Sequence, residues 1–273
     1  MIQYEHKCAK TRKMIFKRLK KTAKMGDFMA LTERQNEILK TLRENKSASV
    51  TELAKDLYVS EATIRRDLAE MKSMGLVERS HGGALLPENA EEISIFFRME
   101  KNASEKERAA TKALPYIPPF KSVFIDSSST ALALAERIDL SYKTVVTNNL
   151  QTAIQLSKKP NINLILLGGN VHFNTNSATG SWTARQLADF SFDLMISSCA
   201  AIVGNSVFER SLEQKEIKRV AFENCKKRIL LIDHTKFSAP GTYRLSSLSE
   251  YDLIVTDTTP PEYLNVGNAK LVY

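Results

Sequence analysis

Between residues 31 and 75 the apolar side chains recur at the three- and four-residue spacing of amphipathic helices. The pattern predicts a first helix from Leu31 to about Glu44, a second of about two turns after Ser49, and a third over 61–74. Ser or Thr followed three residues later by Glu or Gln marks the first two starts, and Ser60 is placed to cap the third. Three helices are therefore predicted, and a tight turn joins the last two.

The short turn before the third helix is typical of a helix-turn-helix, whose second helix enters the major groove of DNA. If Ile64, Leu68 and Met71 pack inward, a rotation of about 100° per residue turns other positions toward solvent. The candidate DNA-reading side chains are Ala62, Thr63 and Arg66 on the outer face and Arg65 on its flank. Arginine can bind both acceptors of guanine, and threonine can contact a base edge or a phosphate. The alternative is the solvated face of an ordinary bundle helix.

A hairpin pattern follows the third helix. Residues 76–81 and 84–86 predict two strands around Gly82 and Gly83. Such a hairpin forms a wing beside a recognition helix, which makes Arg79 and His81 candidates for contact with the DNA backbone.

The pattern changes after a short, acidic, proline-led stretch at 87–92, where we place a domain boundary. Beyond it, apolar runs alternate with helical segments, and Ser104 with Glu107 is placed to cap the first helix. The predicted strands are 122–126, 143–147, 162–167, 193–198, 228–233, 252–256 and 269–272, and the predicted helices lie near 105–114, 130–138, 149–157, 183–190 and 212–225. This alternation predicts a Rossmann-like, mostly parallel α/β domain after the winged helix-turn-helix. The expected division is 1–30, 31–87 and 88–273.

Polar residues follow the predicted strands at the edge of the sheet where such folds bind ligands. The candidate binding residues are Asp126, Ser127, Ser128, Ser129, Thr130, Thr147, Asn148, Gly168, Gly169, Ser198 and Lys236. Backbone amides, hydroxyls and a lysine that converge on one edge suit a phosphate. Taken singly, these residues are more often helix caps and turns.

Composition and charge narrow the classes of protein. The chain has 273 residues with 43% apolar and 26% charged side chains, an ordinary globular composition. It lacks a run of the roughly 18–20 uncharged apolar residues that a membrane-spanning helix needs. Of the net charge of +8, most lies in residues 1–30, which hold nine basic and two acidic residues. We expect a disordered extension there; a tail that binds nucleic-acid phosphate and an amphipathic surface-seeking segment are the alternatives.

Metal, redox and disulfide chemistry have little support in the sequence. The cysteines, Cys8, Cys199 and Cys225, have no paired spacing, which favours a reducing cytoplasm, and we expect the last two to be small buried hydrophobic residues. The four histidines are scattered, so no metal site is expected.

The run 60–68, Ser-Glu-Ala-Thr-Ile-Arg-Arg-Asp-Leu, resembles the DeoR family of bacterial sugar-operon regulators, together with Leu31-Thr32-Glu33-Arg34-Gln35 before it and Gly82-Gly83-Ala84 after it. The resemblance implies DNA contact by Ser60, Thr63, Arg65 and Arg66.

Residues from about 98 to 262 resemble the sensor domain of the same family, which is related to sugar-phosphate isomerases. The landmarks are Asp126 with Thr130, Thr147-Asn148, Leu167-Gly168-Gly169, Gly180, Phe192-Asp193, Glu213 to Lys218, and Asp233 with Lys236-Phe237. The resemblance implies that a phosphorylated sugar effector binds here and alters operator affinity. This chain has Ser128 and Ser198 where the family pattern has glycine. Because a missing Cβ lets the backbone approach a phosphate, these serines predict a narrower pocket, a changed effector or lost binding.

Together these observations predict a cytoplasmic, sequence-specific regulator, with repression of a sugar-metabolism operon as the expected action. We expect a symmetric homo-oligomer on double-stranded operator DNA, and no cofactor, metal or catalytic residue. Two alternatives stay open. One is an isomerase-like enzyme with Asp126, Glu213 or Asp233 as general base, and the other is a regulator whose sensor has lost ligand binding.

Overall fold

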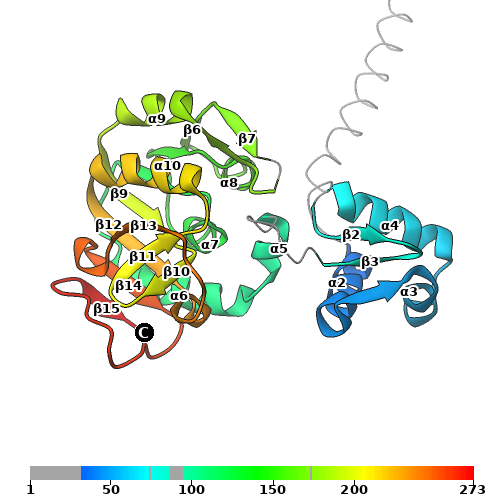
Figure 1. The fold of residues 1–273 in the computed structure, drawn as a ribbon. Helices are drawn as coiled ribbons and strands as arrows, with labels where there is room; N and C mark the ends of the chain where they lie inside the picture. Colours follow the sequence, from blue (N-terminus) through cyan, green and yellow to red (C-terminus); the bar gives the residue numbers. More distant parts are fainter. Residues whose placement is uncertain (1–31, 74, 87–94, 173) are drawn as a thin grey trace, which may run out of the picture. The chain divides into compact units, whose positions relative to one another are not determined.

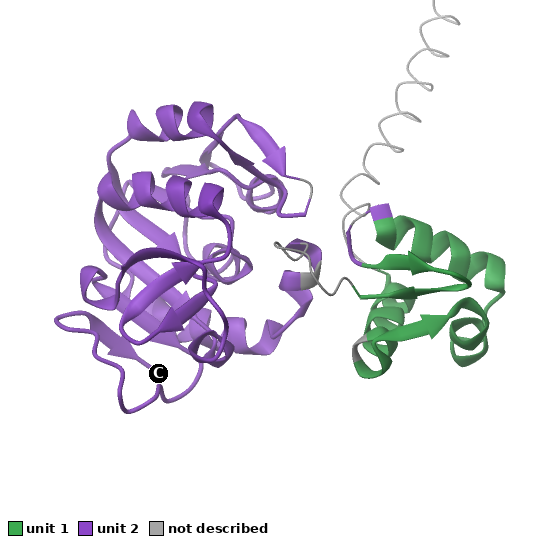
Figure 2. Cartoon of the chain, viewed as in Figure 1, with its two compact units in different colours: residues 1–72, 77–86 green, residues 73–76, 87–273 purple. Residues whose placement is uncertain are grey.

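In a computed structural model of the chain, the described residues are 32–73, 75–86, 95–172 and 174–273. The basic extension expected over residues 1–30 lies outside them. The chain divides into two compact units, Met1–Lys72 with Val77–Leu86 and Ser73–Leu76 with Pro87–Tyr273 (Figure 2). We call them the N-terminal unit and the C-terminal unit.

The N-terminal unit contains the helices α2 (Glu33–Asn45), α3 (Val50–Asp56) and α4 (Glu61–Ser73). Thr32 and Ser49 each form the predicted capping box, so both predicted helix starts are confirmed. One apolar side of each helix is buried, and the interior of the unit is formed by Ile38, Leu39, Leu42, Leu53, Ile64, Leu68 and Met71, each at most 1% exposed. Burial of this continuous apolar surface is what holds the three short helices together.

The predicted wing is present as β2 (Glu78–Ser80) and β3 (Gly83–Leu85), which pair antiparallel. Its inner strand also pairs with β1 (Ser47–Ser49), a strand that the sequence pattern did not predict. Gly83 was expected in the turn but lies within β3. A Cβ at this position would clash with the carbonyl oxygen of Ala48, so the absence of a side chain lets β1 and β3 approach.

The C-terminal unit is built on a seven-stranded sheet in the order β15-β14-β12-β9-β4-β5-β6, and every pairing in it is parallel (Figure 1). In chain order the strands are β4 (Ser122–Ile125), β5 (Thr144–Thr147), β6 (Asn163–Leu166), β9 (Phe192–Ser197), β12 (Cys225–Ile232), β14 (Leu253–Thr256) and β15 (Lys270–Val272). Each of them overlaps a predicted strand, so the predicted parallel α/β architecture is confirmed.

Helices cover both faces of this sheet. The helices are α5 (Ile95–Glu100), α6 (Ala103–Ala113), α7 (Ser129–Ala135), α8 (Leu150–Leu156), α9 (Ser181–Ala188) and α10 (Leu212–Glu223), with 3-10 turns at Leu114–Tyr116, His234–Phe237 and Leu248–Glu250. Side chains from α9 and α10 pack with Phe124 and Leu230 on one face. On the other face, side chains from α6, α7 and α8 pack with Val123 and Leu231. Neighbouring strand residues thus face opposite layers, as a doubly wound sheet requires.

Two features of the C-terminal unit differ from the predictions. Smaller antiparallel pieces were not predicted: β7 (Asn170–His172) with β8 (Ser177–Thr179), and β10 (Ala201–Val203), β11 (Ser206–Glu209) and β13 (Tyr243–Ser247) in a second sheet. The predicted cap of α6 is wrong, because the helix begins after Asn102 in a left-handed conformation and Ser104 bonds to Glu105 instead. Among the described helices, none is long and apolar enough to cross a bilayer.

Candidate functional site

The outer face of α4 carries most of the predicted DNA-reading residues. Ser60 caps the helix, since its hydroxyl accepts the backbone N–H of Thr63 at 3.2 Å. Ala62, Arg65 and Arg66 are exposed, and Thr63 is half-buried. The inward positions Ile64, Asp67, Leu68 and Met71 are buried, as the helical periodicity predicted for its apolar members.

The two arginines of this face differ in what they contact. Arg65 donates to the carboxylate of Glu61 at 2.6 Å, and Glu61 also accepts the hydroxyl of Thr51 at 2.8 Å. The bond from Thr51, followed by the bond from Arg65, lowers the pKa of Glu61. Arg66 has no hydrogen bond or ion pair with another described residue, so its guanidinium can bind an external partner without first breaking an internal contact.

Asp67 lies in the same motif but points inward. Arg34 of α2 donates Nε and Nη2 to its two carboxylate oxygens at 2.5 and 3.0 Å. Gln35 adds a bond to Glu70 at 3.0 Å. These contacts join α2 to α4 and fix the orientation of the exposed face. This positioning role of Asp67 was not predicted from the sequence.

The wing carries Arg79 and His81. Arg79 lies in β2 and is half-buried, and its Nη1 is buried without a hydrogen-bond partner among the described residues. His81 is exposed in the turn between β2 and β3. The structure thus places His81 on the surface, whereas Arg79 is only partly exposed.

The C-terminal unit contains a cavity of about 330 Å³ at the carboxyl ends of β4, β9 and β12. Six of the predicted residues line it, namely Ser127, Ser128, Ser129, Thr130, Ser198 and Lys236. The wall also holds the cations Arg98, Lys101, Lys106, Arg210 and Lys218 and the acids Glu209 and Asp233. Positive groups outnumber negative ones around this cavity, which favours an anionic ligand.

Asp126 does not line the cavity but supports the loops that do. It is fully buried, and its Oδ1 accepts the backbone N–H of Ser128 at 2.9 Å and the hydroxyl of Ser128 at 2.5 Å. Its Oδ2 accepts the N–H of Ser198 at 3.1 Å and lies 2.9 Å from Nζ of Lys218. One carboxylate therefore joins the loops that follow β4 and β9.

Lys218 of α10 is the cation at the centre of this support. It lies 2.6 Å from Glu209 and donates to the carbonyl of Ser198 at 2.7 Å. Burial disfavours its charge, but Asp126 and Glu209 outweigh burial and raise the pKa of the ammonium. Burial raises the pKa of Glu209, although Lys218 opposes that rise. In the sequence, Lys218 stands out only as a family landmark, and its pattern gives no sign of this buried cluster.

Most loop hydroxyls are already used within the protein. Ser127 donates to Gln214 of α10 at 2.9 Å, and Gln214 donates in turn to Ser177 at 2.6 Å. Ser129 donates to the carbonyl of Arg98 in α5 at 3.2 Å. Arg98 also donates to the carbonyl of Ser127 at 3.4 Å, so α5 is tied directly to the loop after β4.

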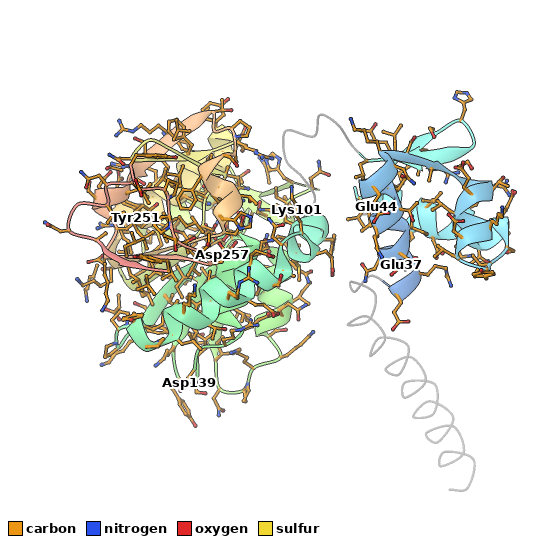
Figure 3. The ribbon with its side chains drawn as sticks, turned by 90° about the horizontal axis from the view of Figure 1, so that it is seen from below. Glu37, Glu44, Lys101, Asp139, Tyr251 and Asp257 are labelled. Atoms are coloured by element: carbon orange, nitrogen blue, oxygen red, sulfur yellow. The ribbon has the colours of Figure 1, made fainter. Side chains whose placement is uncertain are left out.

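Lys106 and Lys101 add positive charge near α5. Nζ of Lys106 donates to the carbonyls of Arg98 and Lys101, although the residue is only 6% exposed. The pKa of Lys106 is lowered to about 8, mainly by burial; Asp233 opposes the shift, and Lys236 adds to it. Lys101 follows α5 directly and is exposed (Figure 3).

Asp233 and Lys236 follow β12 on another wall of the cavity. Oδ1 of Asp233 accepts the backbone N–H and the hydroxyl of Thr235 and the amide of Asn102 at 3.4 Å. Burial would raise the pKa of Asp233, but Lys236 and Thr235 lower it overall. Asp257, labelled in Figure 3, accepts the N–H of His234 at 2.7 Å and so holds this segment in place.

Besides Asp126, four predicted residues do not line the cavity. Asn148 donates to the carbonyl of Ala178 at 2.9 Å, and Thr147 accepts the N–H of Asn149 at 3.2 Å. Gly168 accepts the hydroxyl of Thr183, and a Cβ at Gly169 would clash with that same threonine. The structure shows these residues as part of the packing around β5, β8 and α9.

The described cysteines form no disulfide, and the described acids form no metal site. Cys199 and Cys225 are buried free thiols, as predicted, and burial raises their pKa values to about 12 and about 11. Within the described part of the chain, no group of three His, Cys, Asp or Glu side chains could hold a metal ion.

Comparison with known proteins gives matches to both units. Residues 34–90 match the model of the DeoR-like helix-turn-helix domain, and residues 101–258 match that of the DeoR C-terminal sensor domain. Among solved structures, ribose 5-phosphate isomerase A from Methanocaldococcus jannaschii has a TM-score of 0.37 over 50% of this chain and 55% of its own, at 11% identity.

Curated relatives extend over most of the chain. The transcriptional regulator GolR of Listeria innocua is 35% identical, with 82% of this chain and 90% of its own length covered. The glycerol-3-phosphate regulon repressor of Escherichia coli is 33% identical, with 85% of this chain and 93% of its own length covered. With matches that include both its DNA-binding and its sensor domain, the chain belongs to the DeoR family of transcriptional regulators.

Proposed function

We propose that this protein represses a sugar-metabolism operon and is released from its operator when a phosphorylated sugar binds the cavity of the C-terminal unit. The observation that carries the proposal is the excess of cationic side chains around a cavity of about 330 Å³. Arg98, Lys101, Lys106 and Lys236 suit a phosphate dianion, and the hydroxyl-bearing loops suit a polyol. The relative from Escherichia coli is itself named for the regulon of a phosphorylated polyol.

The hydrogen bonds of Asp126 disfavour it as the general base of an isomerase. Asp126 is engaged by Ser128, Ser198 and Lys218 through both oxygens. A general base needs a lone pair directed at the substrate. Asp126 therefore acts as a structural support for the loops.

We propose that DNA is read by α4 and contacted by the wing, with two copies of the chain on a two-fold symmetric operator. The DNA-binding units of two copies can both contact the operator only when their separation matches the spacing of its half-sites. An effector that binds more tightly to the arrangement that does not match the operator shifts the population toward it, and the protein leaves the DNA. Cytoplasmic location is part of this proposal, because the operator is there.

The test is fluorescence anisotropy of the protein on labelled DNA from its own upstream region with excess random competitor. Ribose 5-phosphate, glucose 6-phosphate and glycerol 3-phosphate are titrated, each beside its unphosphorylated parent. Release by one phosphorylated compound and not by its parent supports the proposal. Equal affinity for operator and competitor DNA contradicts operator reading, and operator binding that none of the esters disturbs contradicts sugar-phosphate control.

Replacing Arg66 with alanine is expected to remove about 1–3 kcal/mol of discrimination between operator and mismatched DNA, because a bidentate contact to guanine is lost. The measurement is competition binding against operators altered one base pair at a time. Lys72→Ala is the matched control, since it removes an exposed cation from the last turn of the same helix. An equal loss on all sequences would identify Arg66 as a phosphate contact.

Effector binding is expected to weaken above pH 8. The pKa of Lys106 is lowered to about 8, so this lysine loses its charge in the free protein as the pH rises through that value. A phosphate dianion binds the protonated form, and affinity should fall by up to about tenfold per pH unit above pH 8. Calorimetric titration from pH 7 to pH 9.5 measures the slope. Lys106→Gln should bind more weakly and lose the slope; a slope kept in that variant would rule out Lys106 as its source.

A further inference from the structure

Oγ of Ser198 and Oδ2 of Asp233 are buried on the cavity walls and have no hydrogen-bond partner among the described residues. For Oδ2 of Asp233, Nζ of Lys236 lies 4.0 Å away, which provides charge compensation. The hydroxyl of Ser198 has no such neighbour, and the residue is only 2% exposed. Burying a hydroxyl without a hydrogen-bond partner is unfavourable, so the buried hydroxyl of Ser198 needs an explanation.

The backbone of Ser198 is held from both sides. Its N–H donates to Oδ2 of Asp126 at 3.1 Å, and its carbonyl accepts Nζ of Lys218 at 2.7 Å. Both partners are themselves buried and belong to one ion-paired cluster. The backbone that carries this side chain is therefore held in position before any ligand arrives, which lowers the entropic cost of a contact.

The other serines of the cavity differ in this respect. Ser127 donates to Gln214, Ser128 donates to Asp126, and Ser129 donates to the carbonyl of Arg98. The hydroxyl of Ser128 also caps α7 by accepting the N–H of Ala131 at 3.1 Å. Ser128 thus has a structural role, whereas the hydroxyl of Ser198 is left for something outside the chain.

The charges around Ser198 indicate which part of a ligand it meets. Lys218 is already offset by Asp126 and Glu209. This wall has no surplus positive charge for a phosphate, while Lys101, Lys106 and Lys236 provide that surplus elsewhere on the cavity wall. A neutral hydroxyl group of a sugar suits Ser198 better.

We infer that Ser198 is a specificity-determining residue whose hydroxyl bonds to a hydroxyl of a phosphorylated polyol in the cavity. The inference rests on the proposed function, because it assigns one contact within the same site. The contact selects for the hydroxylated part of the ligand, and the cations select for its phosphate.

The test compares two kinds of phosphate ester on the full-length protein. Ribose 5-phosphate, glucose 6-phosphate and glycerol 3-phosphate carry hydroxyls, and propyl phosphate carries none. Binding is measured by calorimetry, with propyl phosphate measured by competition, and the melting temperature is recorded for each variant. Ser198→Ala is expected to weaken the best polyol phosphate about three- to tenfold, leave propyl phosphate unchanged, and keep or raise the melting temperature.

Two further variants keep the result interpretable. Ser198→Gly removes the same hydroxyl and should show the same selective loss. Ser128→Ala removes a hydroxyl that is bonded within the protein, so it should lower the melting temperature and weaken both kinds of ester together. A lowered melting temperature with equal weakening of both esters is the result expected for a serine whose hydroxyl only stabilises the fold.

Several results would overturn the inference. An equal loss for polyol and propyl phosphates in Ser198→Ala, a lowered melting temperature, or no change in affinity would each show that the hydroxyl does not select the polyol. If the unaltered protein binds none of the esters, the proposed function fails as well. If it binds propyl phosphate as tightly as the polyol phosphates, only the assignment of Ser198 fails.

Discussion

Replacing Lys218 with methionine is expected to destabilise the C-terminal unit by about 3–5 kcal/mol, because two buried carboxylates lose their shared cation. The side chains of Asp126 and Glu209 are 0% and 9% exposed, so water cannot take over the role of Lys218. Chemical denaturation followed by circular dichroism and by the fluorescence of Trp182, the single tryptophan of the chain, measures the change.

Lys215→Met is the matched control for this variant. It lies on the same helix, but its partner Glu216 is 56% exposed, so its loss should cost at most about 1 kcal/mol. Adding Glu209→Gln to Lys218→Met should recover part of the stability, because one buried charge is removed. If Lys218→Met and Lys215→Met were equally stable, the buried cluster of Lys218, Asp126 and Glu209 would contribute no net stabilisation.

The Lys218→Met variant should also respond to pH. Burial already raises the folded-state pKa of Glu209, and removal of the cation that opposes the rise raises it further. A carboxyl with a raised folded pKa stabilises the fold below its unfolded pKa, and this stability is lost as the pH rises through the folded value. The variant should therefore be more stable at pH 5 than at pH 8.

Replacing Gly83 with alanine is expected to abolish specific operator binding by disrupting the wing. The added Cβ would clash with the carbonyl oxygen of Ala48 and lie 3.0 Å from Cα of Ser49, both on the neighbouring strand. Backbone atoms cannot rotate away as a flexible side chain can, so β1 and β3 must separate, at a cost of about 1–3 kcal/mol or more. Operator affinity and the unfolding transition of the N-terminal unit measure the effect.

Gly82→Asn serves as its control. Gly82 has a φ of 84°, which asparagine tolerates better than most residues, and a Cβ there meets nothing within 4 Å. This variant should keep most of its stability and operator affinity. If Gly83→Ala retained native affinity, β1 would not be needed to support the wing.

The elements that the sequence predicted best are those whose environment is uniform. The inner strands of the parallel sheet are buried on both faces, so each of them appears as an apolar run such as Val123–Ile125. The strands β7 and β1 lack this signal, because β7 is exposed along its length and β1 reads Ser-Ala-Ser. The hairpin of β10 and β11 has a usable signal in Gly204-Asn205, a turn pair between apolar residues.

The candidate site was predictable where residues follow a strand directly. Ser127 to Thr130, Ser198 and Lys236 were expected at the sheet edge and do line the cavity. Lys218 and Gln214 could not be found in this way, since a charged or amide residue on an amphipathic helix looks like part of its solvated face. Their partners are distant in sequence, and only the folded chain brings them together.

The position of α5 has a consequence for building hybrid regulators. This helix begins at Ile95, whereas the last strand of the wing ends at Leu85, and its Arg98 contacts the loop after β4 through both its side chain and its carbonyl. A chimera that joins a foreign DNA-binding domain after α5 would lose the cavity residue Arg98 of α5 together with the native N-terminal unit. A chimera should therefore be joined ahead of Ile95, so that α5 and its cavity residues Arg98 and Lys101 stay with the rest of the C-terminal unit.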